Sequence, residues 1–276
     1  GPDRDGMRPD SMTVASIDAV TGEALLIGLP RDLAYAPFPA DSPMLALYPN
    51  GYGAEGCEVD VCQLNSIFTE VELFHPELYP DAAAAGSSPG IQAMSDAASG
   101  ITGLTMQYYA LIDMAAFEQL IDALGGVTIN VSEAVPVYTD ESLTEVAEWI
   151  GPGATGMNGA TALWYARSRY DTSDYDRMLR QRQLQEAILQ QFTPANVLSK
   201  FQGVAAAGAQ VVRTDIPQSM LGFFVDLAGK TKELPIGSIE LTPIGDVDPE
   251  NPDYAYIHAI IAEATAPPPS PEPDEG

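Results

Sequence analysis

The chain has 276 residues, and its 46% hydrophobic content is enough to bury the core of one large domain. Its 12 Lys and Arg stand against 39 Asp and Glu, which gives a formal net charge of −27. This charge repels phosphate backbones and anionic lipid headgroups, so the composition excludes a non-specific nucleic-acid partner and requires any anionic ligand to be captured by local cations.

The first part of the chain predicts a hairpin, an irregular excursion and two helices. Residues 12–18 (MTVASID) alternate in character and residues 24–30 (ALLIGLP) are a compact apolar run, as is typical of adjacent strands. Residues 36–60 hold many Pro, Gly and Tyr and predict an irregular path. The apolar spacing over residues 64–74 and 91–100 favours helices.

The middle of the chain predicts a recurring β-α-β order. Residues 108–114 (YYALIDM) indicate a buried strand, residues 114–126 a helix closed by glycines, and residues 127–131 (VTINV) the next strand. The segment after Ala134 is polar and poorly periodic, and residues 151–169 indicate a turn followed by a short helix or strand. This order favours α/β layering.

The last part of the chain predicts mainly helices. In chain order we expect a strong helix over 175–191, helical segments near 195–210 and 217–229, a strand over 238–245 and a closing helix over 251–264. Residues 265–276 are Pro-rich and acidic, and we expect a disordered tail after a single domain over 1–264.

The cysteines and the lengths of the apolar runs bear on where in the cell the protein is located. Cys57 and Cys62 either form a local disulfide, which would imply an oxidising extracytoplasmic setting, or remain two free thiols. No run of 18 apolar residues occurs in the chain, and no signal stretch opens it. Because the first residues have the character of the middle of a domain, we expect any membrane anchor to lie upstream.

The few cations of this acidic chain are concentrated in one stretch, ALWYARSRYDTSDYDRMLRQRQ. If residues 165–169 are extended, alternate side chains place Arg167 and Arg169 on the same side. In the helix that follows, Arg177, Arg180 and Gln181 share one face. Guanidinium groups stay charged and bind phosphate or carboxylate in a two-pronged way, so the stretch is a candidate anion site.

The start of the predicted helix supports this interpretation without deciding it. Ser173 and Asp176 have the spacing of a capping box, which places arginines near the first turn, where the helix dipole disfavours cations. An anion bound at that helix start would resolve the conflict. The alternative is a solvated face of ion pairs, because Asp171, Asp174 and Asp176 lie among the arginines.

Charged residues also flank the first two predicted strands. Arg31 and Asp32 follow the apolar run directly, a common position for a site in α/β proteins. Asp3 and Asp10 precede the first strand and could supply oxygen ligands to a hard cation such as Mg²⁺. Each aspartate could instead be a loop cap or a surface charge.

Taken in order, four segments resemble the LytR-CpsA-Psr family of cell-wall glycopolymer transferases: RPDSM (8–12), LPRD (29–32), LIDALGGVTINV (120–131), and LWYARSR with RMLRQ (163–181). The resemblance covers nearly all of residues 1–262. It implies a three-layer α/β/α sandwich around a mixed central sheet, tethered to the membrane upstream. It also implies a place on the outer face of the cytoplasmic membrane or in the cell wall of a Gram-positive bacterium, and the scarcity of lysine fits a high-GC source.

The resemblance also assigns roles by motif. It implies a polyprenyl-pyrophosphate-linked glycan as substrate, with Mg²⁺ or Mn²⁺ as cofactor held by Asp3 and Asp10. The residues that it places on the pyrophosphate or in catalysis are Asp10, Arg8, Arg31, Arg167, Arg169, Arg177, Arg180 and Gln181.

The resulting reaction would transfer the glycopolymer to a peptidoglycan hydroxyl or to a cell-surface protein. Breaking the sugar–phosphate bond would leave a polyprenyl phosphate or pyrophosphate, whose charge the arginines and the metal would stabilise. Asp10 or Asp32 would serve as general base. Two alternatives stay open: a polyprenyl-pyrophosphate hydrolase, and a non-catalytic module that binds lipid-linked glycan or regulates.

Overall fold

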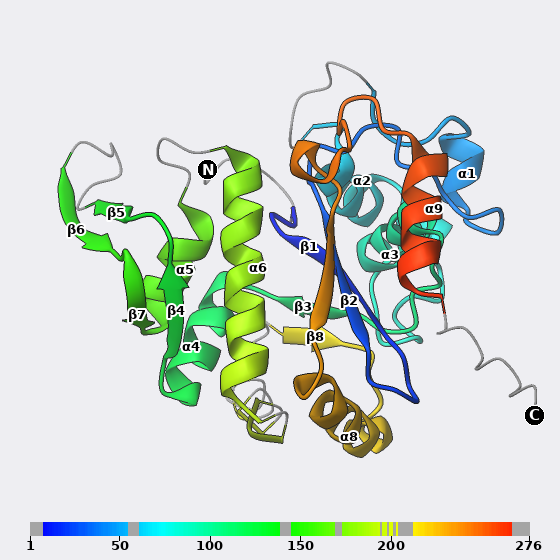
Figure 1. The fold of residues 1–276 in the computed structure, drawn as a ribbon. Coiled ribbons are helices and arrows are strands. Elements are labelled where there is room, and N and C mark those ends of the chain that lie inside the picture. The colour runs from blue at the N-terminus through cyan, green and yellow to red at the C-terminus, as the bar shows by residue number, and fades with distance from the viewer. Residues whose placement is uncertain are drawn as a thin grey trace, which may run out of the picture.

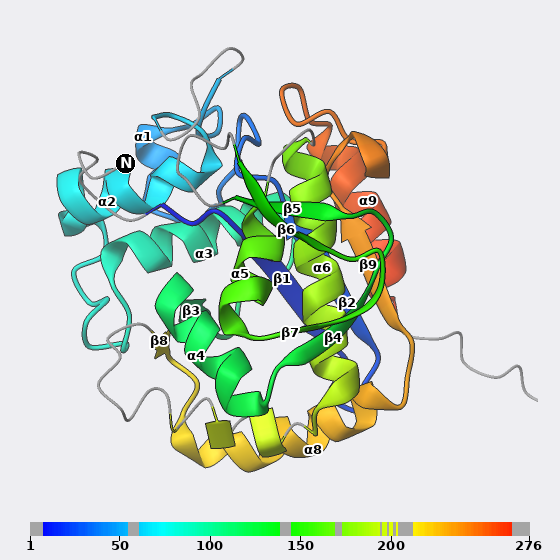
Figure 2. The same cartoon turned by 90° about the vertical axis from the view of Figure 1, so that its left-hand side faces the viewer.

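A computed structural model describes residues 8–54, 61–138, 145–168, 173–193, 195–197, 199–200, 203 and 212–266. The fold is mixed α/β, as expected. Figure 1 shows a sheet of β1, β2 and β9 between two groups of helices, with α2, α3 and α9 on one side and α5 and α6 on the other. The view in Figure 2 shows the same layering from the side of α5 and α6.

The central sheet is mixed and has the order β1-β2-β9. β1 (Met12–Ile17) and β2 (Ala24–Leu29) form the predicted antiparallel hairpin, and β9 (Ile236–Glu240) runs parallel to β2. The hairpin turn is fixed by Asp18, whose Oδ1 accepts bonds from the N–H groups of Val20 (2.8 Å) and Thr21 (2.6 Å). β2 lies between the other two strands, which is why its sequence is an apolar run without alternation.

One face of this sheet packs against a helical layer that includes the chain's last helix. Its core joins β2 with residues such as Ile67, Ala97 and Ile257, all fully buried. Gly100 lies against the carbonyl of Pro37, so closely that a Cβ there would fall 1.9 Å from that oxygen. The elements of this layer are α1 (Met44–Leu47), η1 (Leu64–Ser66), α2 (Ile67–Phe74), η2 (Pro76–Leu78), α3 (Pro89–Thr102), η4 (Pro243–Gly245) and α9 (Tyr254–Ala264).

The other face carries a second core built around α5 and α6. α4 ends at Gly125, whose φ of +92° is the left-handed value that a predicted glycine stop requires. Two antiparallel pairs, β4 with β7 and β5 with β6, complete this part. Its elements are α4 (Met114–Leu124), β4 (Val127–Val131), β5 (Val135–Tyr138), β6 (Val146–Ile150), β7 (Gly153–Met157), α5 (Gly159–Arg167) and α6 (Asp174–Gln191).

A small third region ends in a helix at the base of the molecule in Figure 1. β3 (Ala110–Ile112) pairs antiparallel with β8 (Val212–Thr214), and α8 (Leu221–Lys232) follows η3 (Gln218–Met220). The strand expected over 108–114 is therefore present, but it is short, and its burial was predicted wrongly: two of its three residues are exposed. It forms part of a two-stranded ladder outside the central sheet.

Two further differences from the sequence predictions concern the second core. The poorly periodic segment after Ala134 forms β5 and β6, which pair with each other and leave polar positions of β6 exposed. Residues 165–167 are the last turn of α5 and not an extended run, because Asn158 caps that helix by accepting from the N–H of Thr161 at 2.9 Å. The helix expected near 195–210 and the tail over 267–276 lie mostly or wholly outside the described residues.

Candidate active site

The centre of the candidate site is a carboxylate shared by two arginines from different parts of the fold. Arg31 lies two residues after the end of β2 and donates from Nε to Oδ2 of Asp174 at 3.2 Å. Arg177, one turn into α6, donates from Nη2 to the same oxygen at 2.8 Å. Arg31 also reaches Asp10 Oδ1, 3.4 Å from its Nη1. The end of β2, the start of α6 and the segment before β1 therefore meet at one point.

The shared carboxylate does not satisfy every donor of Arg177. Arg177 is 2% exposed, and its Nε has no acceptor among the residues that the structure describes. A buried N–H left without an acceptor costs roughly 1–3 kcal/mol, so the site is destabilised until an acceptor is provided. Asp10 is 56% exposed and stands at the solvent side of the cluster.

The N-terminus of α6 adds partial positive charge at the same place. The predicted capping box is confirmed: Ser173 Oγ accepts from the N–H of Asp176 at 3.2 Å, and Asp176 Oδ2 accepts from the N–H of Ser173 at 2.8 Å. Both acids favour the helix start, and Asp174 is its first residue. The helix dipole disfavours the positive charge of Arg177 near this N-terminus, and the ion pair with Asp174 compensates that unfavourable interaction.

Asp32 is the second carboxyl group of interest in the site. Its Oδ1 is buried and has no hydrogen-bond partner in the described part of the chain. Burial, and then the nearby charge of Asp174, raise the pKa of Asp32 above its ordinary value. Burial, followed by the charges of Asp32 and Asp174, raises the pKa of Tyr175 to about 12, which places Tyr175 beside the same two carboxylates. A carboxylate with a raised pKa is a stronger base than an ordinary aspartate.

Arg180 and Gln181, which the family resemblance assigned to the pyrophosphate, bind main-chain carbonyls in this structure. Arg180 donates from Nε to Tyr165 O at 3.1 Å and from Nη2 to Ser168 O, while Gln181 Nε2 donates to Ala166 O at 3.2 Å. These bonds satisfy the last carbonyls of α5, which a helix end leaves without partners. The two residues join α6 to α5 and so fix where Arg177 stands.

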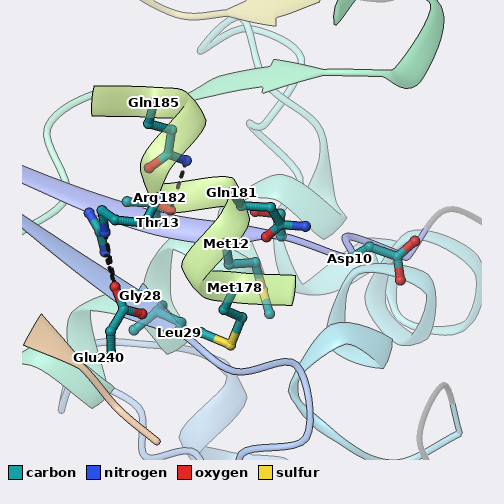
Figure 3. Close-up of a pocket in the computed structure, with 11 residues that line it drawn as sticks. Asp10, Met12, Thr13, Gly28, Leu29, Met178, Gln181, Arg182, Gln185 and Glu240 are labelled. Atoms are coloured by element: carbon teal, nitrogen blue, oxygen red, sulfur yellow. Dashed lines mark hydrogen bonds and ion pairs between the residues drawn. The ribbon is translucent and has the colours of Figure 1, made fainter. Parts of the chain in front are cut away.

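A buried ion pair joins α6 to the central sheet further along the helix. Arg182 donates to Glu240 Oε1 on β9 from Nε at 2.9 Å and from Nη2 at 2.6 Å. Figure 3 shows this pair beside Gly28, with Gln185 pointing to Thr13 on β1 and Gln181 on the side nearer Asp10. The small pocket between α6 and the hairpin, about 10 Å³, holds about one water. This ion pair therefore fixes the position of α6 along the central sheet, and with it the position of Arg177.

The remaining predicted residues differ in how the structure places them. Arg167 ends α5, is exposed, and makes no hydrogen bond or ion pair with any described residue. Arg8 is half-buried; burial raises the pKa of Tyr52, and the charge of Arg8 lies close enough to that phenol to oppose the rise. Asp3 and Arg169 lie outside the described residues, so their placement stays a prediction.

One of the two cysteines and one of the two expected metal ligands lie among the described residues. Cys62 is disulfide-bonded, whereas Cys57, the chain's other cysteine, lies outside the described residues. Within the described ranges, no group of three or more His, Cys, Asp or Glu is arranged to hold a metal ion. None of the helices described is long and apolar enough to cross a membrane.

Sequence reasoning did not assign Asp174 or Tyr175 a role in the site. Asp174 was considered only as one of several acids that could form surface ion pairs, yet it bridges Arg31 and Arg177. The available signal was its position three residues before Arg177, a spacing at which helical side chains meet. Asn65 also adjoins the site, because its N–H donates to the carbonyl of Arg31 at 3.2 Å.

Comparison with known proteins relates the whole chain to one family. The profile of the LytR_cpsA_psr family matches residues 2–260. Biofilm regulatory protein A of Streptococcus mutans is 30% identical over 136 residues, which are 49% of this chain and 32% of that protein. The cell wall biosynthesis protein LcpA of Corynebacterium glutamicum is 29% identical over 198 residues, 68% of this chain and 37% of that protein. The chain thus spans about a third of the length of these relatives.

Solved structures share the fold. B. subtilis TagV superposes with a TM-score of 0.59 at 18% identity, over 93% of this chain and 89% of that one. Protein gbs0355 of Streptococcus agalactiae gives 0.57 at 23% identity, over 85% and 69%. A structure of TagT bound to LI-WTA gives 0.55 at 19% identity, over 93% and 83%.

Proposed function

We propose that this chain, which belongs to the LytR_cpsA_psr family, is a cell-wall glycopolymer transferase. It moves a glycopolymer from a polyprenyl-(pyro)phosphate carrier to a peptidoglycan hydroxyl or to a cell-surface protein. The name of LcpA, a cell wall biosynthesis protein, and the fold shared with TagT bound to LI-WTA support this class of substrate. The disulfide at Cys62 supports an oxidising setting outside the cytoplasm, where such acceptors lie.

The observation that carries the proposal is the pair of guanidinium groups on Asp174. Arg31 and Arg177 come from different elements, both are largely buried, and Arg177 Nε has no acceptor among the described residues. Phosphate oxygens would supply the missing acceptor, and two guanidinium groups beside a helix N-terminus favour a doubly charged group such as a pyrophosphate. The chain carries a net charge of −27, so a pyrophosphate would have to be held by local cations such as these.

The same groups suit the charge that develops during transfer. If the acceptor hydroxyl oxygen bonds to the anomeric carbon of the glycan, the sugar–phosphate bond breaks and the carrier leaves as polyprenyl pyrophosphate. If it bonds to the phosphorus next to the sugar, the P–O–P bond breaks, the phosphate travels with the glycan, and the carrier leaves as polyprenyl phosphate. Arg31 and Arg177 stabilise the negative charge on that leaving group, at positions fixed before the reaction starts. The hydroxyl proton passes to Asp32, because its raised pKa and its buried Oδ1, unpartnered among the described residues, suit a general base.

We include Mg²⁺ or Mn²⁺ in the proposal with Asp10 as its protein ligand. Mg²⁺ usually takes one or two carboxylates and completes its shell with water and phosphate oxygens, so a single exposed carboxylate beside the arginines fits this mode of binding. When bound, the ion would polarise a phosphoryl oxygen as a Lewis acid. Asp3, the second expected ligand, lies outside the described residues.

The test is a coupling assay with a polyprenyl-pyrophosphate oligosaccharide as donor and peptidoglycan fragments as acceptor, with Mg²⁺ or with a chelator. Product masses show whether the glycan is coupled and whether a phosphate travels with it. Arg31→Gln and Arg177→Gln are each expected to lower coupling by ~10²–10³-fold, the range for removing one donor that stabilises developing charge. Lys200→Gln, which removes an exposed cation outside the candidate active site, is the control for the loss of positive charge.

Other products would point to the other functions. Free glycan without coupled product would replace the transferase with a hydrolase of the same carrier. Tight donor binding without any turnover, with Mg²⁺ or with a chelator, would favour a binding or regulatory module. The name of Biofilm regulatory protein A is consistent with a regulatory role.

A further inference from the structure

A second cavity, about 240 Å³, lies between α3 and the segment that leads into β3, and it shares no lining residue with the arginine site. Figure 2 shows α3 near β3 and β8, the strands that adjoin the lining residues Tyr109 and Asp215. Its lining is polar and aromatic and includes Tyr79, Gln92, Asp96, Gln107, Tyr108 and Asp215. The pocket beside Arg182 holds about one water in about 10 Å³, so a space of about 240 Å³ is large enough for a small ring-shaped ligand.

Hydrogen-bond donors and acceptors both line this cavity. Gln92 and Asp96 lie one turn apart on α3. Asp96 Oδ2 accepts from the hydroxyls of Ser42 (2.5 Å) and Tyr79 (2.7 Å), whereas its Oδ1 has no partner among the described residues. The side-chain amides of Gln92 and Gln107 form no hydrogen bond with described residues either, and each offers two donors and an acceptor.

The wall opposite α3 is held in place by side-chain bonds to its backbone. The N–H of Tyr109 donates to Asp215 Oδ1 at 2.8 Å, and its hydroxyl donates to Gly86 O at 2.8 Å. The ring of Tyr108 meets Phe224 edge to face, with centroids 5.4 Å apart. Tyr108 is nevertheless 38% exposed. An aromatic surface is therefore presented at the rim in a fixed orientation, which lowers the entropy cost of binding.

The charges of the lining select the ligand class. Among the described residues, two aspartates and no Lys or Arg line the cavity, so this lining repels phosphates and carboxylates. Its polar lining does not suit a lipid tail. Within the described residues no group of acids is arranged as a metal site. An uncharged sugar ring fits all three conditions, because its hydroxyls can donate to Asp96 and bond to the amides while its C–H face lies on Tyr108.

We propose that this cavity is a sugar subsite that takes one uncharged ring of a glycan. The inference rests on the proposed function for its role, since a transferase must hold a glycan chain apart from the charged centre. The glycan could belong to the acceptor strand or to the donor, and the two share this chemistry.

The binding chemistry is tested without transfer, by calorimetric titration of the chain with a soluble, uncharged tetramer of β-1,4-linked N-acetylglucosamine. Gln107→Ala and Tyr108→Ala, both at exposed positions, should each weaken binding by roughly three- to tenfold, the loss of one hydrogen bond or aromatic contact. Tyr108→Phe keeps the ring and should bind like the wild type. Gln218→Ala, an exposed glutamine outside the cavity, is the matched control for Gln107.

Two further experiments distinguish donor glycan from acceptor glycan, and failure of the subsite from failure of the transferase proposal. Prior loading with the lipid-linked donor should displace the tetramer if the cavity takes donor glycan, and should leave its affinity unchanged if the cavity takes the acceptor. Arg177→Gln should abolish donor binding and spare tetramer binding. No titratable tetramer binding to the wild type, or equal binding by Gln107→Ala, Tyr108→Ala and the wild type, would overturn the subsite while leaving the transferase proposal standing.

Discussion

The ion pair between Arg182 and Glu240 offers the sharpest stability prediction, because it joins the helix that carries Arg177 to the central sheet. The two side chains are 7% and 11% exposed, and one carboxylate oxygen accepts two bonds at 2.9 and 2.6 Å. An exposed pair would contribute about 0–1 kcal/mol. At this burial, removing one partner leaves an uncompensated charge in the interior, for a cost of about 3–5 kcal/mol.

Arg182→Met is therefore expected to lower the free energy of unfolding by about 3–5 kcal/mol, because it leaves the Glu240 carboxylate buried. Glu240→Gln should cost less, since its amide oxygen still accepts from Arg182. The double variant should be more stable than the sum of the single losses, by about 2 kcal/mol or more, since no buried charge remains.

Urea unfolding of the four proteins, followed by circular dichroism, gives the coupling energy. Arg213→Met removes an exposed arginine and corrects for the added net charge; it should change stability by less than about 0.5 kcal/mol. A loss below about 1 kcal/mol for Arg182→Met, with additive single effects, would refute the reasoning. It would mean that water reaches the pair and that the pair does not set the position of α6.

Three further predictions follow from single residues. Arg177→Lys keeps the charge but not the fork of donors, so pyrophosphate affinity measured by calorimetry should fall about tenfold, and an unchanged affinity would argue against two-pronged binding. Asp32 has a raised pKa in the fold, so its contribution to stability is present at low pH and lost as pH rises through that pKa; Asp32→Asn should raise the urea midpoint at neutral pH while slowing coupling, and a lower midpoint would contradict this. Gly100→Ala should cost about 1–3 kcal/mol because its Cβ would meet the carbonyl that faces it, whereas Gly229→Ala, with open space in α8, should gain roughly 0.5–1 kcal/mol; equal midpoints would show that the close approach is not needed.

Much of the local structure was predictable because neighbouring residues determine it. Alternation and an apolar run predicted the β1–β2 hairpin, Ser173 and Asp176 predicted the start of α6, and Gly125 predicted the end of α4. The exposed ladder at β3 and the pair of β5 with β6 were not foreseen. Their strands pair with partners that no local pattern identifies, and they lie outside the central sheet.

Of the candidate site, the sequence by itself determined that an acidic chain gathers its arginines and which motifs carry them. Only the tertiary structure decided how they are used. Arg177 and Arg31 meet on Asp174, although Arg31 and Asp174 are 143 positions apart in the chain. Arg180 and Gln181 instead bind the carbonyls that end α5. A guanidinium group can satisfy a phosphate, a carboxylate or a helix end equally well, and only the distances created by folding select among these partners.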